Sequence, residues 1–101
     1  MQKFKNINIS EFEKISNYDN SIIIDIRDQE SFTENHIPNA EHFSSEKIMN
    51  LVETKNKDAH LLIYCYKGNS SQKVAYFLSE SGFKNVYSLI GGFNLWKNQI
   101  K

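Results

Sequence analysis

Residues 60–82 read HLLIYCYKGNSSQKVAYFLSESG and join two apolar segments through a short polar loop. Positions 61–64 form a continuous apolar run, which is typical of a strand buried on both faces of a sheet. After the loop, apolar side chains return at helical spacing up to Gly82, which stands where a glycine commonly ends a helix. The stretch predicts a strand, a loop and a helix in succession. It places Cys65, the only cysteine, at the carboxyl end of the strand.

The polar loop, residues 66–71, has a composition that suits the binding of a sulfur anion. Its glycine and asparagine tolerate unusual backbone angles, and its two serines are good N-cap residues. Backbone N–H groups of such a turn and of a helix N-terminus make a concave site with partial positive charge. We therefore expect a lowered pKa for the Cys65 thiol, without the help of a histidine base. Lys67 is expected to attract an anionic substrate to the rim.

An unreactive buried thiol is the alternative for Cys65, since free cysteines are among the most buried residues. The polar sequence that follows it is a poor environment for a small hydrophobic side chain and favours exposure. We therefore take the cysteine as the candidate catalytic residue. The candidate substrate-binding residues are those of the loop: Tyr66, Lys67, Gly68, Asn69, Ser70 and Ser71.

The loop sequence CYKGNSS at 65–71 resembles the active-site loop of the rhodanese family of sulfurtransferases, especially its bacterial single-domain members of the GlpE type. Three other segments resemble family motifs and occur in the family's order. Residues 25–30 are similar to its Asp-x-Arg strand end, residues 36–40 to its Gly-His-Ile-Pro-Gly-Ala turn, and residues 86–96 to its last strand with the Gly-Gly-x-x-x-Trp signature. The resemblance runs from about Asn6 to the end and implies a single rhodanese domain over residues 1–101.

Strand patterns alternate with helix patterns along the whole chain, which predicts a parallel α/β sheet with ligands bound at the strand carboxyl ends. The resemblance implies a rhodanese-like α/β fold with a central, mostly parallel five-stranded sheet and helices on both faces. We expect strands near residues 7–9, 21–26, 41–43, 61–64 and 85–89. We expect helices near residues 10–16, 29–35, 45–55, 70–81 and from the glycine pair at 91–92 onward.

Three residues are expected to have local structural roles. Arg27 either binds an anion or anchors the strand end through charge-assisted hydrogen bonds with Asp25 and Glu30, and we favour the anchor. Asn35 replaces the family's glycine and is expected to take a positive φ. His36 is expected to fix its turn by hydrogen bonding.

Three further expectations concern the chain's two ends. Ser10 and Glu13 have capping-box spacing. The glycine pair at 91–92 is expected to let backbone approach the loop closely, and Trp96 to lie in the core.

The composition narrows the function classes. Acidic and basic residues balance at 12 each, so no overall field favours nucleic acid or an anionic membrane. One cysteine excludes an internal disulfide and a multi-cysteine zinc site, and the three histidines lack ligand-like spacing, so we expect no metal and no organic cofactor. No apolar run is long enough for a signal peptide or a membrane span. A cytoplasmic setting, where thiols stay reduced, is expected.

The resemblance implies a thiosulfate sulfurtransferase. The Cys65 thiolate would take the outer sulfur of thiosulfate as a persulfide, and cyanide or a thiol, such as that of a thioredoxin-like protein, would remove it. A persulfide relay fed by another sulfur donor uses the same chemistry and stays open, as does the oligomeric state.

A rhodanese-fold phosphatase or arsenate reductase is a remote alternative. The loops of those enzymes are one residue longer and end in an arginine, whereas Ser70 and Ser71 stand here and no arginine follows Arg27.

Overall fold

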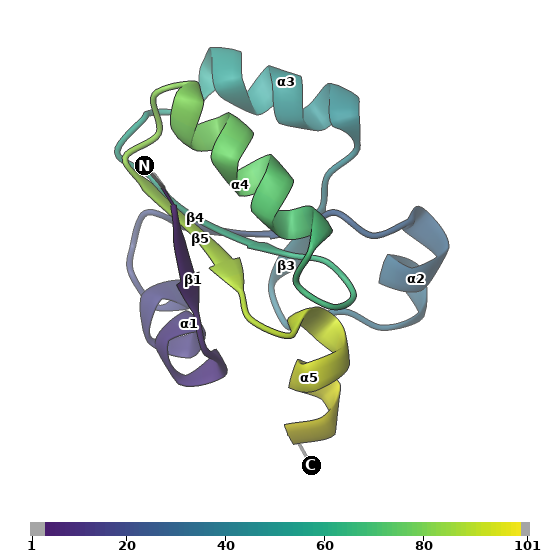
Figure 1. Ribbon diagram of the computed structural model, residues 1–101. Coiled ribbons are helices and arrows are strands. Elements are labelled where there is room, and N and C mark those ends of the chain that lie inside the picture. The colour runs from purple at the N-terminus through teal and green to yellow at the C-terminus, as the bar shows by residue number, and fades with distance from the viewer. Residues whose placement is uncertain (1–3, 100–101) are drawn as a thin grey trace.

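The computed structural model describes residues 4–99, in which strands and helices alternate (Figure 1). In chain order they are β1 (Lys5–Ile7), α1 (Ile9–Ser16), β2 (Ser21–Asp25), α2 (Gln29–Glu34), β3 (Ala40–His42), α3 (Ser45–Thr54), β4 (His60–Tyr64), α4 (Ser70–Glu80), β5 (Asn85–Leu89) and α5 (Gly92–Gln99). The described strands form one sheet in the order β1-β5-β4-β2-β3, and all their pairings are parallel. The predicted five-stranded α/β sheet is confirmed, and it is parallel throughout rather than mostly so.

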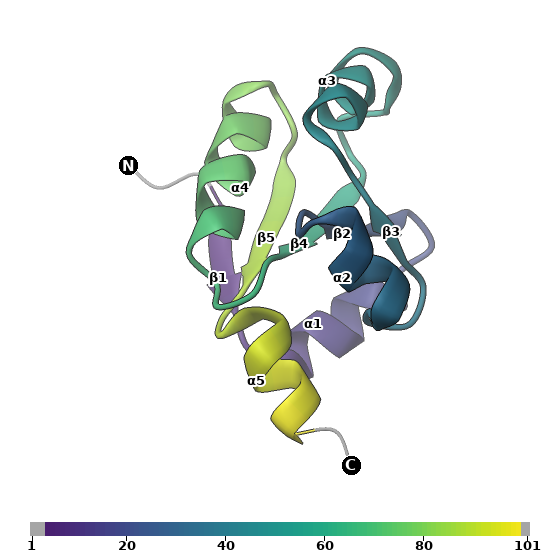
Figure 2. The same cartoon turned by 90° about the vertical axis from the view of Figure 1, so that its right-hand side faces the viewer.

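Helices cover both faces of the sheet, as predicted. Figures 1 and 2 show α3 and α4 on one face and α1 and α5 on the other. The chain leaves β2 toward the β3 edge and leaves β4 toward the β5 edge, so the connections after these two neighbouring strands diverge. Ligands of open α/β sheets commonly bind at such a switch point, beyond the strand carboxyl ends. Cys65 follows β4 directly and therefore lies at this position.

The central strand β4 alternates its side chains between two apolar layers. Leu61 and Ile63 belong to the layer formed with α3 and α4. Leu62 and Tyr64 belong to the layer formed with α1 and α5. All four side chains are fully buried. Burying one such aliphatic side chain contributes about 1.5–3 kcal/mol, so the strand that delivers Cys65 is held firmly from both faces.

The amino-terminal helix begins earlier than its predicted capping box. Asn8 is the N-cap: its side chain accepts a hydrogen bond from the Glu11 N–H at 2.8 Å, and the Glu11 carboxylate accepts one from the Asn8 N–H at 3.3 Å. The predicted box of Ser10 and Glu13 was therefore wrong by two residues. The predicted strand was also late, because Ile9 already lies in α1.

The turn before β3 places its left-handed residue later than predicted. Asn35 has φ −167°, which is extended backbone that any residue adopts, so the expected positive φ at this position was wrong. The residue with positive φ is Asn39, at +71°. Pro38 precedes it, and the tight bend comes directly before β3 begins at Ala40. An asparagine supplies the left-handed angle here in the role usually given to glycine.

Within residues 4–99, no helix is long and apolar enough to cross a membrane.

Candidate active site

The Cys65 sulfur lies inside the loop between β4 and α4. It accepts hydrogen bonds from the backbone N–H groups of Gly68 at 3.2 Å and Ser71 at 3.3 Å, and the Ser71 hydroxyl lies 3.4 Å away. The φ of Gly68 is +96°, a left-handed angle that glycine adopts without a steric penalty. The cysteine side chain is only 5% exposed. The loop thus surrounds the sulfur with donors and leaves a narrow approach.

The start of α4 differs from the prediction that a serine caps it. Asn69 is the N-cap, with no side-chain capping bond, and Ser70 is the first helical residue. The Ser71 side chain turns inward to the sulfur instead of capping the helix. The first N–H groups of a helix have no partner within it. Because no side chain caps α4, the Ser71 N–H is available to the sulfur, and the partial positive charge of the helix end acts on the same atom.

The loop favours the ionised form of this thiol. Burial alone raises the pKa of Cys65. The hydrogen bonds from the hydroxyl and N–H of Ser71 and from the N–H groups of Gly68 and Lys67 lower it, and their combined effect is larger than that of burial. The net pKa lies below the ordinary value for a cysteine, as the sequence predicted. A lowered pKa raises the fraction of the thiol that is ionised, and the thiolate is the nucleophilic form of cysteine.

The beginning of α5 fixes the loop from the other side. The Phe93 N–H donates to the Cys65 carbonyl oxygen at 2.8 Å, and the Asn94 N–H donates to the Tyr66 carbonyl oxygen at 2.9 Å. Gly92 has φ +59°, and a Cβ atom added there would lie 2.5 Å from the carbonyl oxygen of Cys65. The predicted close approach of the glycine pair to the loop is confirmed.

A Gly92→Ala substitution is expected to lower the free energy of unfolding by about 2–4 kcal/mol, since it adds both left-handed strain and a backbone clash. Urea denaturation measures this loss. Gly82→Ala is the matched control: Gly82 has φ +106°, but its added Cβ would meet only the Lys57 side chain, at 3.7 Å. An equal loss in the two variants would show that Gly92 is not needed for close packing against the loop.

A shallow cavity of about 380 Å³ opens over the sulfur, lined by Cys65, Tyr66, Lys67, Asn69, Ser70 and Asn94. The structure thus brings five of the predicted residues to the cavity, while Gly68 and Ser71 are buried and do not line it. Asn94 was not predicted. Its one sequence signal is its position two residues after the glycine pair. A larger hollow of about 570 Å³ along α3 holds none of these residues.

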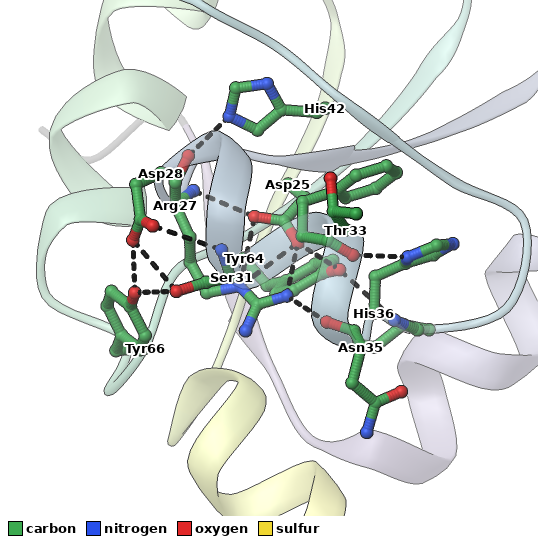
Figure 3. Close-up of polar contacts among 12 residues, drawn as sticks. Asp25, Arg27, Asp28, Ser31, Thr33, Asn35, His36, His42, Tyr64 and Tyr66 are labelled. Atoms are coloured by element: carbon green, nitrogen blue, oxygen red, sulfur yellow. Dashed lines mark hydrogen bonds and ion pairs between the residues drawn. The ribbon is translucent and has the colours of Figure 1, made fainter.

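Tyr66 forms one wall of the cavity, but its hydroxyl is held by α2 (Figure 3). The hydroxyl donates to the Asp28 carboxylate and shares a hydrogen bond with the Ser31 hydroxyl. The bond from Tyr66, with those from Ser31, lowers the pKa of Asp28 to about 2. The Tyr66 hydroxyl is therefore engaged by Asp28 and Ser31, while the residue lines the cavity.

Arg27 anchors the strand end, as favoured from the sequence (Figure 3). Its guanidinium binds the Asp25 carboxylate through Nε and Nη2, and Nη2 donates to the Asn35 carbonyl oxygen at 2.6 Å. It lies 4.0 Å from the centre of the Phe93 ring and is 6% exposed. Glu30, the third predicted member, is exposed on α2. The arginine is not among the residues that line the cavity over the sulfur.

His36 has the structural role that was expected, whereas Trp96 packs against the core without being fully buried in it. The Nδ1 atom of His36 lies 2.8 Å from the Phe32 carbonyl oxygen, and its ring stacks on the Phe32 ring at 3.9 Å. Trp96 is half-buried and packs on Phe93 in the α1–α5 layer. In the part of the chain that the structure describes, no cluster of three or more His, Cys, Asp or Glu side chains is arranged to hold a metal ion.

Comparison with known proteins gives consistent matches. The family model described as the rhodanese-like domain matches residues 8–99. A Coxiella burnetii protein named thiosulfate sulfurtransferase GlpE is 54% identical over 76 residues, which are 75% of this chain and 71% of that protein. A Pseudomonas putida protein of the same name is 37% identical over 97 residues, 96% of this chain and 88% of the relative. The crystal structure of a Staphylococcus aureus rhodanese-like domain protein has a TM-score of 0.77 at 29% identity and covers 92% of this chain and 91% of its own.

Proposed function

Because this chain belongs to the rhodanese-like domain family, we propose that it is a thiosulfate sulfurtransferase in which Cys65 carries the sulfur. The observation that supports this most is the position of the Cys65 sulfur, inside a loop whose N–H groups and serine hydroxyl point at it. Such a loop stabilises the Cys65 thiolate before the reaction and the negatively charged outer sulfur of the persulfide after it. The test is loading of the protein by thiosulfate, described at the end of the Discussion.

The first half-reaction begins with attack of the Cys65 thiolate on the outer sulfur of thiosulfate. A bond forms between Cys65 Sγ and that sulfur, and the sulfur–sulfur bond within thiosulfate breaks. Sulfite leaves with the electron pair, and the protein becomes a persulfide. Lys67 and Ser70 line the cavity and are proposed to bind the oxygens of the dianion.

In the second half-reaction, cyanide or a thiolate attacks the outer sulfur of the persulfide. The bond to Cys65 Sγ breaks, and the cysteine leaves as a thiolate, which the N–H groups of Gly68 and Ser71 again stabilise. The two steps form a double displacement, so ping-pong kinetics are expected. No cofactor takes part in either step.

Lys67→Ala is expected to raise the KM for thiosulfate about 3- to 10-fold and to change kcat little, because the exposed lysine attracts the substrate without touching the reacting sulfur. Initial rates at varied thiosulfate and low ionic strength measure this. Lys73→Ala, which removes an exposed lysine of α4 away from the cavity, is the matched control and is expected to change neither constant. A Lys67→Ala enzyme with unchanged KM at low salt would remove this residue from the binding site.

The acceptor in the cell is proposed to be a thiol, such as that of a thioredoxin-like protein. The chain is proposed to act as a single rhodanese domain in a reducing cytoplasm, where its lone cysteine stays available.

A further inference from the structure

Two buried serine hydroxyls form a hydrogen-bonded chain from the Cys65 sulfur to strand β5. The Ser71 Oγ atom lies 3.4 Å from the sulfur and 2.8 Å from the Oγ atom of Ser88, a residue of β5. Ser71 and Ser88 are both 0% exposed, so water does not reach either hydroxyl. Ser88 pairs in register with Ile63 of β4, two residues before the cysteine. Strand β5 thus supplies a buried hydroxyl that reaches the sulfur through Ser71.

The hydrogen bonds available to these two hydroxyls depend on the charge of the sulfur. Among the described residues, Ser71 is the one hydrogen-bond partner of the Ser88 hydroxyl. If Cys65 is a thiol, one of two arrangements holds. Either the thiol donates to Ser71, which then donates to Ser88 and leaves the Ser88 proton without an acceptor, or Ser71 donates to a neutral sulfur, which is only a weak acceptor. If Cys65 is a thiolate, Ser88 donates to Ser71 and Ser71 donates to the sulfur, so both protons are used. A buried hydroxyl proton without an acceptor is destabilising, so this pair favours the thiolate.

We propose that Ser88 is a positioning residue that orients the Ser71 hydroxyl toward the Cys65 sulfur and thereby favours its ionised form. The inference deepens the proposed function and rests on it, since it assigns Ser88 a part in the same nucleophile. In the second half-reaction the same chain of hydroxyls presents a proton to the departing Cys65 sulfur. Hydrogen bonds in such a chain polarise one another, which strengthens the one that reaches the charge.

Among the described residues, the other titratable groups around the loop make no hydrogen bond to the hydroxyls of Ser71 and Ser88. They are Tyr66 and Lys67 in the loop, Tyr64 at the end of β4, and the Asp25–Arg27 ion pair with which Tyr64 makes its hydrogen bond. The remaining elements contribute uncharged groups: Ser71 from α4, Ser88 from β5 and Asn94 from α5. A substitution at position 88 therefore changes none of the surrounding charges.

The rate at which iodoacetamide alkylates Cys65, followed from about pH 5 to about pH 10, measures the thiolate fraction. Cys65 is the only cysteine, so the reaction has one site. Ser88→Ala is expected to slow alkylation about 3- to 10-fold at neutral pH and to move the profile to higher pH, with wild-type rates restored in alkali. Ser79→Ala is the matched control. It removes another buried hydroxyl, on α4, that has no partner among the described residues, and it should leave the profile unchanged.

A double-variant comparison separates this role from a general effect on packing. Ser71→Ala is expected to shift the profile at least as far as Ser88→Ala, and adding Ser88→Ala to it should produce no further shift. An unchanged profile in Ser88→Ala, or an equal shift with and without Ser71, would overturn the proposal. Alkylation needs no thiosulfate, so a protein that fails to use thiosulfate refutes the proposed function and still tests the role of Ser88.

Discussion

The Cys65→Ser variant is expected to show no measurable sulfur transfer from thiosulfate to cyanide, a loss of at least about a thousandfold in kcat. The serine hydroxyl stays protonated at neutral pH and offers no sulfur for the persulfide bond, so the first half-reaction has no nucleophile. No second thiol replaces it, because the chain has one cysteine. Thiocyanate formation from thiosulfate and cyanide measures the rate.

The fold of this variant should be intact, which makes the loss interpretable. A serine oxygen accepts the same N–H bonds from Gly68 and Ser71 that the sulfur accepts, and the change in volume is small. We expect thermal unfolding to differ little from that of the wild type, and Ser79→Ala to keep full activity as a matched buried substitution. Turnover in a folded Cys65→Ser protein would mean that another group performs the transfer.

Asp25→Ala is expected to lower the free energy of unfolding by about 3–5 kcal/mol, the usual cost of removing one partner of a buried ion pair. The Asp25 carboxylate is fully buried and accepts hydrogen bonds from the N–H and guanidinium of Arg27 and from the Tyr64 hydroxyl at 2.6 Å. Its loss leaves the arginine charge buried and unpaired beneath Phe93. Chemical denaturation monitored by fluorescence of the single tryptophan measures the change.

Asp58→Ala is the matched control for this effect. Asp58 and Lys84 form an ion pair at 3.5 Å in which both side chains are largely exposed, and such surface pairs contribute at most about 1 kcal/mol. A loss in Asp25→Ala as small as that in Asp58→Ala would show that the Asp25–Arg27 pair does not stabilise the strand end.

The strand, loop and helix around Cys65 were predictable because each has a local signal. The apolar run at 61–64 indicated a buried strand, and Gly82, with φ +106°, ends the helix as predicted. In the loop, Gly68 takes the left-handed angle that a glycine permits, at φ +96°, whereas Asn69 stays in the right-handed helical region. Sequence order alone then placed the cysteine at the carboxyl edge of the sheet.

The errors arose where several residues of suitable type compete for one role. Asn8 with Glu11 and Ser10 with Glu13 both have capping-box spacing, and the structure uses the earlier pair, directly after β1 ends at Ile7. Either serine after Asn69 was a suitable cap, but Ser71 was drawn to the sulfur by contacts that exist only in the folded chain. Secondary-structure patterns carry no information about such tertiary partners.

The residues that sequence reasoning missed have no local signal at all. A serine within a strand, such as Ser88, has the same pattern whether it faces a core, solvent or an active cysteine. Only the register of β5 against β4 brings the Ser88 hydroxyl to Ser71 and, through Ser71, to the sulfur. Asn94 likewise reaches the cavity because Gly92 lets α5 start against the loop.

The intact mass of the purified protein, measured before and after incubation with thiosulfate and again after cyanide, tests the central claim most directly. We expect the wild type to gain the mass of one sulfur atom with thiosulfate, to lose it to cyanide with release of thiocyanate, and the Cys65→Ser variant to show neither change. An unchanged mass in wild-type protein exposed to thiosulfate would contradict the assignment of Cys65 as the carrier of its outer sulfur.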